Sequence, residues 1–229
     1  MAVRTIFVPD KKKVGVNKID VHFQWNSGLS IEQKQKNVIA LHRGAQQYGL
    51  KSILEVSTKS LDPIGVALSA FNLMITTKKN YSFSVESAFQ ASKVFENGGP
   101  YLDLFKVDSR TAKKDVRIRN SGNIESFRFF NYEFPNIPRT YFYDWLYINA
   151  LLKNSPLKDK VLGYDSFSDI EFNSEKSVNC QAHAIALYLS LLNFGFKSDE
   201  LRHPVDFLNK CRDYYSVSEV KEQSQMSIF

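Results

Sequence analysis

Alternating apolar and polar side chains near the N-terminus predict a small β-sheet. Between residues 19 and 25, apolar side chains alternate strictly with polar ones, a period of two that is typical of a half-buried strand. Residues 3–8 form a second run of strand length. A helix is then predicted over 30–48, because Ser30 opens a capping box and Gly49 follows the last helical position.

The remainder of the chain is predicted to be mainly helical. Two further extended segments, 52–57 and 66–75, flank a polar linker over 58–65. Apolar spacing and stop signals predict helices over 84–95, 109–120, 140–154, 155–163, 178–194 and 198–215. The segment 178–194 is apolar on all sides, which predicts a central buried helix. The expected fold class is therefore α+β, helix-dominated, with a small N-terminal β-sheet.

The chain is expected to form a single domain over residues 1–229. A chain of 229 residues can bury a sizeable core, and no internal repeat or low-complexity linker divides it. Residues 1–57 would supply the N-terminal strands and helix, and 58–215 the main core. Residues 216–229 are polar, which predicts a frayed tail.

The most informative helix is the one predicted over 84–95, because its polar side chains form a single narrow stripe. Ser84 is suited to cap this helix, and the stripe consists of Glu86, Gln90 and Lys93. Apolar side chains cover the rest of the helix surface: Val85, Ala88, Phe89, Ala91, Val94 and Phe95. A buried carboxylate and a buried amine need polar partners or water. The stripe therefore predicts a wet pocket, and an internal Glu–Lys arrangement or contact with solvent is the alternative.

Two other polar segments interrupt apolar surroundings. Residues 167–173 carry Asp169 between aromatic side chains, just before the predicted buried helix. Residues 177–181 include Asn179, at the expected N-terminus of that helix, where free backbone N–H groups favour an anion. Taken alone, a turn capped by an aspartate is the favoured interpretation of the first segment, and an ordinary N-cap is the favoured interpretation of the second.

Composition and charge are those of a folded protein without an evident metal site. Hydrophobic residues make up 43% of the chain, and the net charge of +6 suits a phosphate-bearing partner without requiring one. The two cysteines and four histidines match no metal-ligand spacing. His183 and Cys180 could form a Cys–His nucleophile, but a core histidine is the favoured interpretation. With no signal-peptide pattern and no membrane-length apolar stretch, we expect a cytoplasmic protein that needs no cofactor.

Several segments resemble the NADAR/YbiA superfamily. Residues 85–95 resemble its [ST]-x-E-H-x-x-Q-A-x-K-F signature, with Ser87 in place of the histidine. Residues 68–71 and 112–117 are similar to its L-S-N-F and A-x-x-x-G-R segments. The sequences GGPYLDL, FYDWLYINAL and FSDIEFNSEKSVNCQA resemble the branch of NADAR antitoxins associated with DarT toxins. The resemblance covers about residues 38 to 194.

The resemblance implies a mainly helical YbiA-like core and hydrolysis of N-glycosidic bonds. In the toxin-associated branch it implies removal of ADP-ribose from guanine bases of DNA, as the antitoxin to a DarT-type DNA ADP-ribosyltransferase. The expected partners are ADP-ribosylated DNA and ADP-ribose, with the cognate toxin as a further candidate. Two alternatives stay open: a small-molecule N-glycosidase acting on a phosphoribosylated pyrimidine of the riboflavin pathway, and a non-catalytic module that binds ADP-ribose or the toxin.

The resemblance and the polar segments together give a set of expected site residues. The carboxylate of Glu86 would stabilise an oxocarbenium-like transition state and activate water. Lys93 would orient Glu86, donate a proton or attack the opened sugar as a Schiff-base nucleophile, and Asp169 is the second carboxyl group. Arg117 and Asn179 are expected near a pyrophosphate. The residues expected to bind substrate are Ser69, Asn72, Gln90, Arg117, Trp145, Phe172 and Asn179, with Trp145 or Phe172 stacking on a base.

Overall fold

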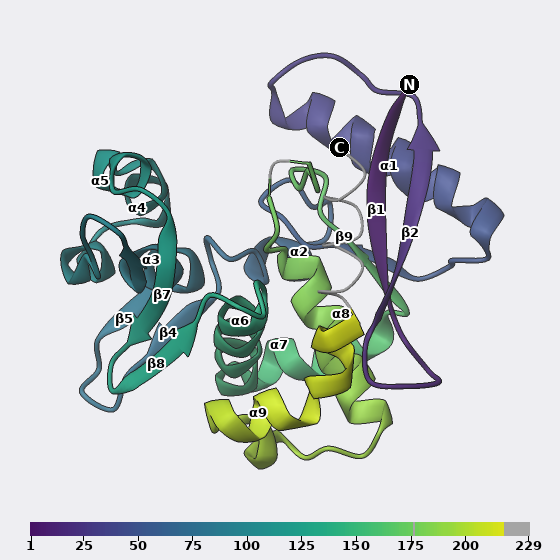
Figure 1. Ribbon diagram of the computed structural model, residues 1–229. Coiled ribbons are helices and arrows are strands. Elements are labelled where there is room, and N and C mark those ends of the chain that lie inside the picture. The colour runs from purple at the N-terminus through teal and green to yellow at the C-terminus, as the bar shows by residue number, and fades with distance from the viewer. Residues whose placement is uncertain (176, 218–229) are drawn as a thin grey trace.

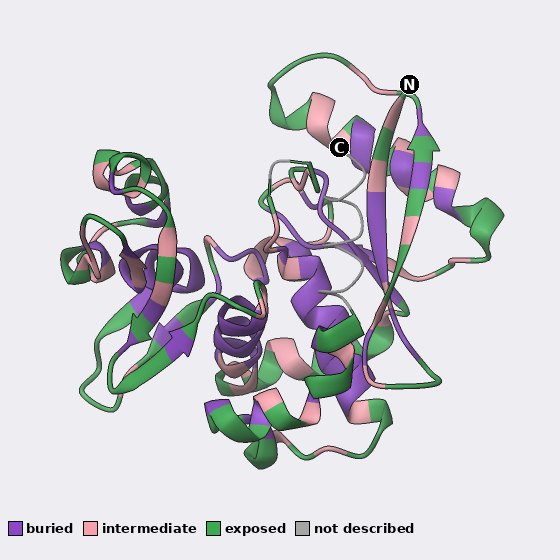
Figure 2. Cartoon of the chain, viewed as in Figure 1, coloured by how far each residue is buried: buried purple, intermediate pink, exposed green. Residues whose placement is uncertain are grey.

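Two buried helices, α6 and α8, pack against each other at the centre of the fold (Figure 1). The structure is a computed structural model that describes residues 1–175 and 177–217. Helix α6 spans Tyr141–Lys153 and α8 spans Gln181–Asn193, and most of their side chains are buried (Figure 2). The predicted central buried helix is thereby confirmed, although α8 begins at Gln181 rather than at 178.

A four-stranded sheet lies beside these helices, with the strand order β2, β1, β9, β3. Strand β1 pairs antiparallel with β2 and β9, and β9 pairs parallel with β3. The strands span Ala2–Pro9 (β1), Val16–Phe23 (β2), Ile53–Glu55 (β3) and Ser166–Ser168 (β9). The predicted N-terminal strands are confirmed. Strand β9 was not predicted, because it is a short segment from far along the chain that joins β1 to β3.

Helix α1, Ile31–Ala45, packs against β2 and encloses a separate apolar cluster with the sheet. The Ser30 hydroxyl caps it by accepting a hydrogen bond from the Gln33 amide at 3.3 Å. A 3₁₀ turn, η1 (Gln46–Tyr48), continues the helix to Gly49, whose φ of 77° suits a residue without Cβ. The predicted helix over 30–48 is confirmed at both ends.

The segment between β3 and α3 differs from its prediction. Helix α2, Pro63–Ala67, replaces the first part of the extended segment predicted over 66–75. Asp62 accepts a hydrogen bond from the Ile64 amide at 2.8 Å, and proline is favoured at the first helical position. Only residues 74 and 75 of that segment are extended. With Thr76 they form β4 (Met74–Thr76), which pairs with β5 (Ser82–Ser84).

Helix α3 is shorter than predicted, and this changes the position of Lys93. The helix spans Val85–Ala91, and its predicted cap is present, because Ser84 accepts from the Ser87 amide at 3.0 Å. Residues Lys93–Phe95 form strand β6, which pairs with β7. The prediction of one helix over 84–95 is therefore wrong for its last turn. A β-branched and an aromatic residue there join a sheet, and this pairing overrides helical spacing.

Strand β6 belongs to a three-stranded antiparallel sheet that was not predicted. Its other strands are β7 (Ile124–Phe129) and β8 (Tyr132–Pro135), in the order β6, β7, β8. The sheet packs on α6 through aromatic side chains, with the rings of Phe127 and Phe134 each 4.7 Å from that of Phe142. In Figure 1 this sheet lies on the left with α3, α4 and α5, away from β1 and β2.

The helix predicted over 109–120 is broken at Asp115. Helix α4 spans Ser109–Lys114 and α5 spans Val116–Asn120, and Asp115 caps α5 by accepting from the Arg117 amide at 2.9 Å. The elements not yet described are η2 (Leu102–Lys106), α7 (Ser155–Lys160), η3 (Val161–Gly163), η4 (Ser198–Leu201) and α9 (Pro204–Lys210).

These elements agree with the predicted class: α+β with more helix than strand and a small N-terminal sheet. Of the predicted tail, residues 218–229 lie outside the described part of the chain. Across residues 1–175 and 177–217, no helix has the length and apolar character needed to cross a membrane. The extent of a single domain over 1–229 stays a prediction.

Candidate active site

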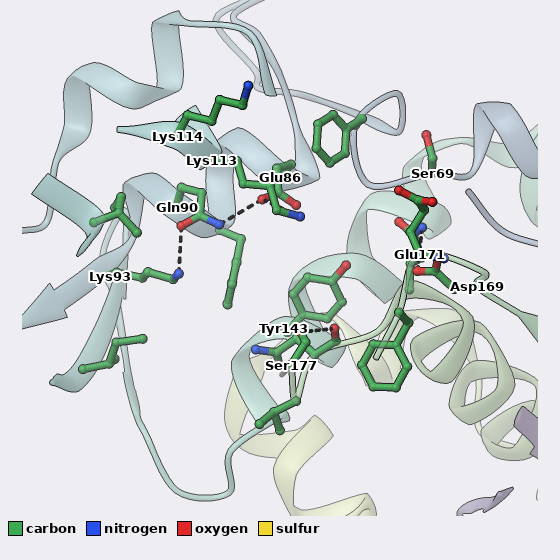
Figure 3. Close-up of a pocket in the computed structure, with 18 of the residues that line it drawn as sticks. Ser69, Glu86, Gln90, Lys93, Lys113, Lys114, Tyr143, Asp169, Glu171 and Ser177 are labelled. Carbon is green, nitrogen blue, oxygen red and sulfur yellow. Dashed lines mark hydrogen bonds and ion pairs between the residues drawn. The ribbon is translucent and has the colours of Figure 1, made fainter. Parts of the chain in front are cut away.

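A cleft of about 1340 Å³ separates the α3–β6–α4 region from the loop between β9 and α8. Figure 3 shows Glu86, Gln90, Lys93 and Lys113 on one wall and Asp169 on the other, with Tyr143 below them. The helical stripe and the segment around Asp169 are far apart in sequence, and the fold brings both to the same cleft. The polar stripe therefore faces a cleft, as predicted.

The first wall is organised around Glu86, which is only 6% exposed. Its amide donates to the Ala70 carbonyl at 2.9 Å, which fixes the start of α3 against the 68–72 turn. Its Oε1 accepts a hydrogen bond from Gln90 Nε2 at 2.9 Å, one helical turn further on. Lys113 Nζ on α4 lies 3.9 Å from the same oxygen. The carboxylate is therefore held by an amide and approached by an ammonium group.

Lys93 reaches this wall from β6, and it contacts Glu86 through Gln90. Its Nζ donates to Gln90 Oε1 at 2.8 Å, and Gln90 Nε2 in turn donates to Glu86. Burial lowers the pKa of Lys93 to about 8, an effect that the negative charge of Glu86 partly opposes. Near neutral pH, Lys93 is therefore an uncharged amine in a fraction of the protein molecules.

Asp169 forms the second wall, directly after β9. Its Oδ1 accepts from the Glu171 amide at 3.0 Å, and its Oδ2 accepts from Gln181 Nε2 at 3.1 Å. Burial, followed by the negative charge of Glu55, raises the pKa of Asp169 to about 8. At neutral pH this carboxyl group therefore keeps its proton. A capping turn is present, as the alternative interpretation held, and the same side chain also lines the cleft.

One residue of the 68–72 turn connects the two walls through its main chain. The Ala70 carbonyl accepts from the Glu86 amide at 2.9 Å, and the Ala70 amide donates to Gln181 Oε1 at 2.6 Å. Gln181 then donates from Nε2 to Asp169 and to the Val56 carbonyl. The Ala70 bridge, as we call this path, joins the backbone of Glu86 to the side chain of Asp169.

Cationic side chains outnumber carboxyl groups among the residues that line the cleft. The cations are Lys59, Lys93, Arg110, Lys113, Lys114 and Arg139, and the carboxyl groups are Glu86, Asp169 and Glu171. Such a lining attracts an anionic ligand, and phosphate groups are the anions that lysine and arginine commonly bind. Within the described ranges, no three His, Cys, Asp or Glu side chains gather closely enough to hold a metal ion.

A comparison with protein families identifies the family of this chain. A family model described as DarT1-associated NADAR antitoxin matches residues 2–221. The chain belongs to the DarT1-associated NADAR antitoxin family. The match includes the N-terminal strands as well as the cleft, so it extends well beyond the segments that carried the resemblance. A comparison with curated proteins finds no match.

In this NADAR antitoxin, Tyr143 is a cleft residue that was not among the expected site residues. It lies on α6, is 5% exposed and lines the cleft. Burial and the nearby negative charges, chiefly that of Glu86, raise the pKa of Tyr143 well above its usual value. Among the residues described, none forms a hydrogen bond with its hydroxyl group. A neutral phenol is thus available to a ligand. An aromatic residue on a buried helix is usually core, so no sequence signal distinguished it.

Four of the expected substrate-binding residues line the cleft: Ser69, Gln90, Phe172 and Asn179. The Phe172 ring packs edge-on against Phe7, with 5.8 Å between ring centroids. Asn179 Oδ1 is buried and has no hydrogen-bond partner within the described chain, which leaves an acceptor for a ligand. Asn179 precedes α8 and is separated from its first residue by Cys180, so it is not within the helix as expected.

Three other expected residues lie away from the cleft. Arg117 pairs with Asp103 at 2.6 Å and with Asp115 at 2.8 Å, so these carboxylates neutralise its charge. Trp145 is buried in the core and donates from Nε1 to the Arg202 carbonyl at 3.0 Å. Asn72 is exposed and donates to the Val66 carbonyl at 2.9 Å. The physical reason is the same for all three: each has its partners within the protein.

The structure also places His183 in the core. Its Nδ1 lies 3.0 Å from Asp144 Oδ1, and its Nε2 lies 2.6 Å from Tyr214 Oη. Asp144 also accepts from Tyr215 at 3.1 Å. Burial raises the pKa of the Cys180 thiol well above its ordinary value, the opposite of what a nucleophilic cysteine needs. The core histidine is the interpretation that these contacts favour.

Proposed function

We propose that this NADAR antitoxin is an N-glycosidase that removes ADP-ribose from guanine bases of DNA. The observation that carries the proposal is the pairing of two different carboxyl groups across one cleft. Glu86 is held as an acceptor by Gln90, and Asp169 keeps a proton at neutral pH because its pKa is about 8. Cleavage of an N-glycoside needs one group that stabilises positive charge and another that protonates the leaving base.

The proposed reaction assigns one role to each carboxyl group. As the bond between the anomeric carbon and the base nitrogen breaks, its electron pair passes to the nitrogen, which takes the proton of Asp169. Positive charge develops on the sugar, where the Glu86 carboxylate stabilises it. A water molecule gives a proton to Glu86 and its oxygen bonds to the anomeric carbon. Transfer of that proton through solvent to Asp169 restores the starting state.

We propose that Lys93 serves this reaction by orienting Glu86 through Gln90. The two hydrogen bonds of 2.8 and 2.9 Å that join the three side chains support this role. The other possibility is attack of the Lys93 amine on the opened sugar, which a pKa of about 8 would permit at neutral pH. The two roles can be distinguished, because only attack by Lys93 forms a covalent intermediate between the lysine and the sugar.

The size and charge of the cleft support a substrate larger than a free nucleotide. Its volume of about 1340 Å³ exceeds the roughly 300–1,000 Å³ of typical small-molecule sites. ADP-ribose carries a pyrophosphate, and a DNA strand adds further phosphates, which suits the cationic lining. The description of the family, an antitoxin associated with DarT1, supports a role opposite to that of such a toxin.

The experiment that tests this proposal compares possible substrates directly. The protein is incubated with DNA that is ADP-ribosylated on guanine, DNA that is ADP-ribosylated on thymine, an ADP-ribosylated protein and a phosphoribosylaminopyrimidine. Released ADP-ribose or ribose phosphate is measured by mass spectrometry, with Glu86→Gln as the inactive control. We expect release from modified guanine. Cleavage of the pyrimidine compound alone, or tight ADP-ribose binding without turnover, would refute the proposal and favour one of the alternative functions.

A further inference from the structure

A second buried carboxyl group, Glu55, lies behind the cleft wall that carries Asp169. Glu55 ends strand β3 and is only 2% exposed. In the described part of the chain, no lysine or arginine lies within ion-pair distance of it. A carboxyl group buried without a cation is costly unless hydrogen bonds satisfy it. Neighbouring hydrogen-bond donors must therefore compensate for the burial of the Glu55 carboxyl group.

The donors that satisfy Glu55 lie on both sides of Asp169 in the sequence. Ser168 Oγ donates to Glu55 Oε2 at 2.6 Å, and the Ile170 amide donates to Oε1 at 2.9 Å. Strand β9 ends at Ser168 and Ile170 lies in a turn, so Glu55 binds the side chain before Asp169 and the main-chain amide after it, which restricts the backbone on both sides. Glu55 thus fixes the backbone that presents Asp169 to the cleft.

The hydrogen bonds of Glu55 also extend to the cleft and to helix α1. Ser57, which lines the cleft, donates to Glu55 Oε1 at 2.6 Å. On the other side, His42 Nε2 on α1 lies 2.8 Å from Ser168 Oγ. Burial lowers the pKa of His42 to about 4, so the imidazole is neutral at physiological pH and supplies no positive charge to this group.

The two carboxyl groups are close enough for the charge of one to affect the other. Burial raises the pKa of Glu55, whereas its three hydrogen-bond donors lower it. Asp169 accepts fewer hydrogen bonds, and the negative charge of Glu55 adds to its burial. Of the pair, Glu55 is therefore the ionised member and Asp169 keeps the proton. The titratable groups that face Asp169 are Glu55 from β3, Glu171 from its own loop, Lys113 from α4, Tyr143 and Tyr147 from α6, and Cys180 before α8.

We infer that Glu55 is a positioning residue for Asp169: it holds the chain on both sides of Asp169 and keeps the Asp169 carboxyl group in its acid form. The inference rests on the proposed function for its catalytic meaning, since an acid is useful there only if a base must be protonated. Its physical content, the interaction between Glu55 and Asp169, is independent of any substrate.

The test is Glu55→Gln, which removes the charge and keeps the shape. The new amide oxygen can accept from Ser57 and the Ile170 amide. The new NH₂ group can donate to Ser168, whose hydroxyl proton then turns toward His42. The Asp169 carboxyl carbon is followed by ¹³C NMR against pH in the protein without substrate, and its signal is assigned by its absence in Asp169→Asn. We expect the midpoint near pH 8 to fall by about one pH unit or more in Glu55→Gln.

Asp144→Asn is the matched control, because Asp144 is an equally buried carboxyl group that does not line the cleft. It should leave the Asp169 midpoint unchanged. With modified DNA as substrate, the fall of kcat/KM at alkaline pH should begin at a lower pH in Glu55→Gln than in the wild type, since the acid form of Asp169 is lost earlier.

An Asp169 midpoint that is the same in Glu55→Gln and in the wild type would overturn the inference, because the loss of the Glu55 charge would then have no effect on Asp169. Should Glu55→Gln not fold, the wild-type titration decides, because an Asp169 signal that titrates in the ordinary aspartate range would overturn it as well. A shifted midpoint in a protein without glycosidase activity would support the coupling and refute only the proposed function.

Discussion

Replacing Lys93 by methionine should remove a pH-dependent penalty on the stability of this protein. Lys93 Nζ lies 4.7 Å from the centre of the Phe89 ring, and burial lowers its pKa from 10.5 to about 8. In the unfolded chain the lysine regains its ordinary pKa, so the unfolded state binds the proton more tightly. The folded state is therefore penalised most below pH 8, and the penalty fades as the pH rises toward 10.5.

The size of this penalty follows from the shift. A change from 10.5 to about 8 corresponds to roughly 3 kcal/mol at pH 7, of which about 1 kcal/mol is recovered by pH 9. Lys93→Met also loses the hydrogen bond to Gln90, and leaving a buried acceptor unpaired costs about 1–3 kcal/mol. That second cost does not vary with pH, so the change between two pH values isolates the buried charge.

The assay is urea unfolding of the wild type, Lys93→Met and Lys114→Met at pH 7 and pH 9. Lys114 also lines the cleft but is exposed, which makes it the matched control. The unfolding free energy of the wild type should rise relative to Lys93→Met by about 1 kcal/mol between the two pH values, whereas Lys114→Met should follow the wild type. An equal difference between wild type and Lys93→Met at both pH values would refute the reasoning.

Three further predictions concern the proposed reaction. Glu86→Gln should lower kcat by about 10²–10⁴ with an unchanged melting temperature, and a folded variant that cleaves at the wild-type rate would exclude Glu86 as the essential carboxylate. Lys93→Arg should keep measurable activity, and borohydride added during turnover should trap no adduct; an adduct mapped to Lys93 by mass spectrometry would instead establish the Schiff-base role. Affinity for modified DNA, measured by fluorescence anisotropy, should fall as salt increases, and Lys114→Met should make the salt dependence shallower; affinity independent of salt would mean that the protein does not contact the DNA phosphates.

Local patterns in the sequence were sufficient for the elements whose signals lie within a few residues. Ser84 and Ser30 cap helices as predicted, and the apolar run before Gly195 forms the buried helix α8. The polar stripe located one wall of the cleft, even though Lys93 belongs to a strand. Its side chain still reaches Gln90, because the strand starts where the helix ends.

Features that depend on partners distant in sequence could not be predicted. Strand β6 exists because it pairs with β7, and a three-residue segment carries no alternation from which this can be read. Glu55 is one carboxylate in an extended segment, a pattern that equally describes a solvent-facing residue. Only its position beside β9 shows that it is buried next to Asp169. Trp145 is the opposite case, since a large aromatic residue suits both base stacking and a core.

The Ala70 bridge links the two carboxyl groups through main-chain atoms of a buried residue rather than through its side chain. Its links at Ala70 are a main-chain carbonyl and a main-chain amide, which any amino acid except proline supplies. If the cleft widens to admit a DNA strand, either one of the hydrogen bonds of the bridge breaks or Glu86 and Asp169 move as one unit. In the second case, adaptation to the strand comes from the lysines and arginines of α4. Their exposed side chains can move with the phosphates while the distance between Glu86 and Asp169 stays the same.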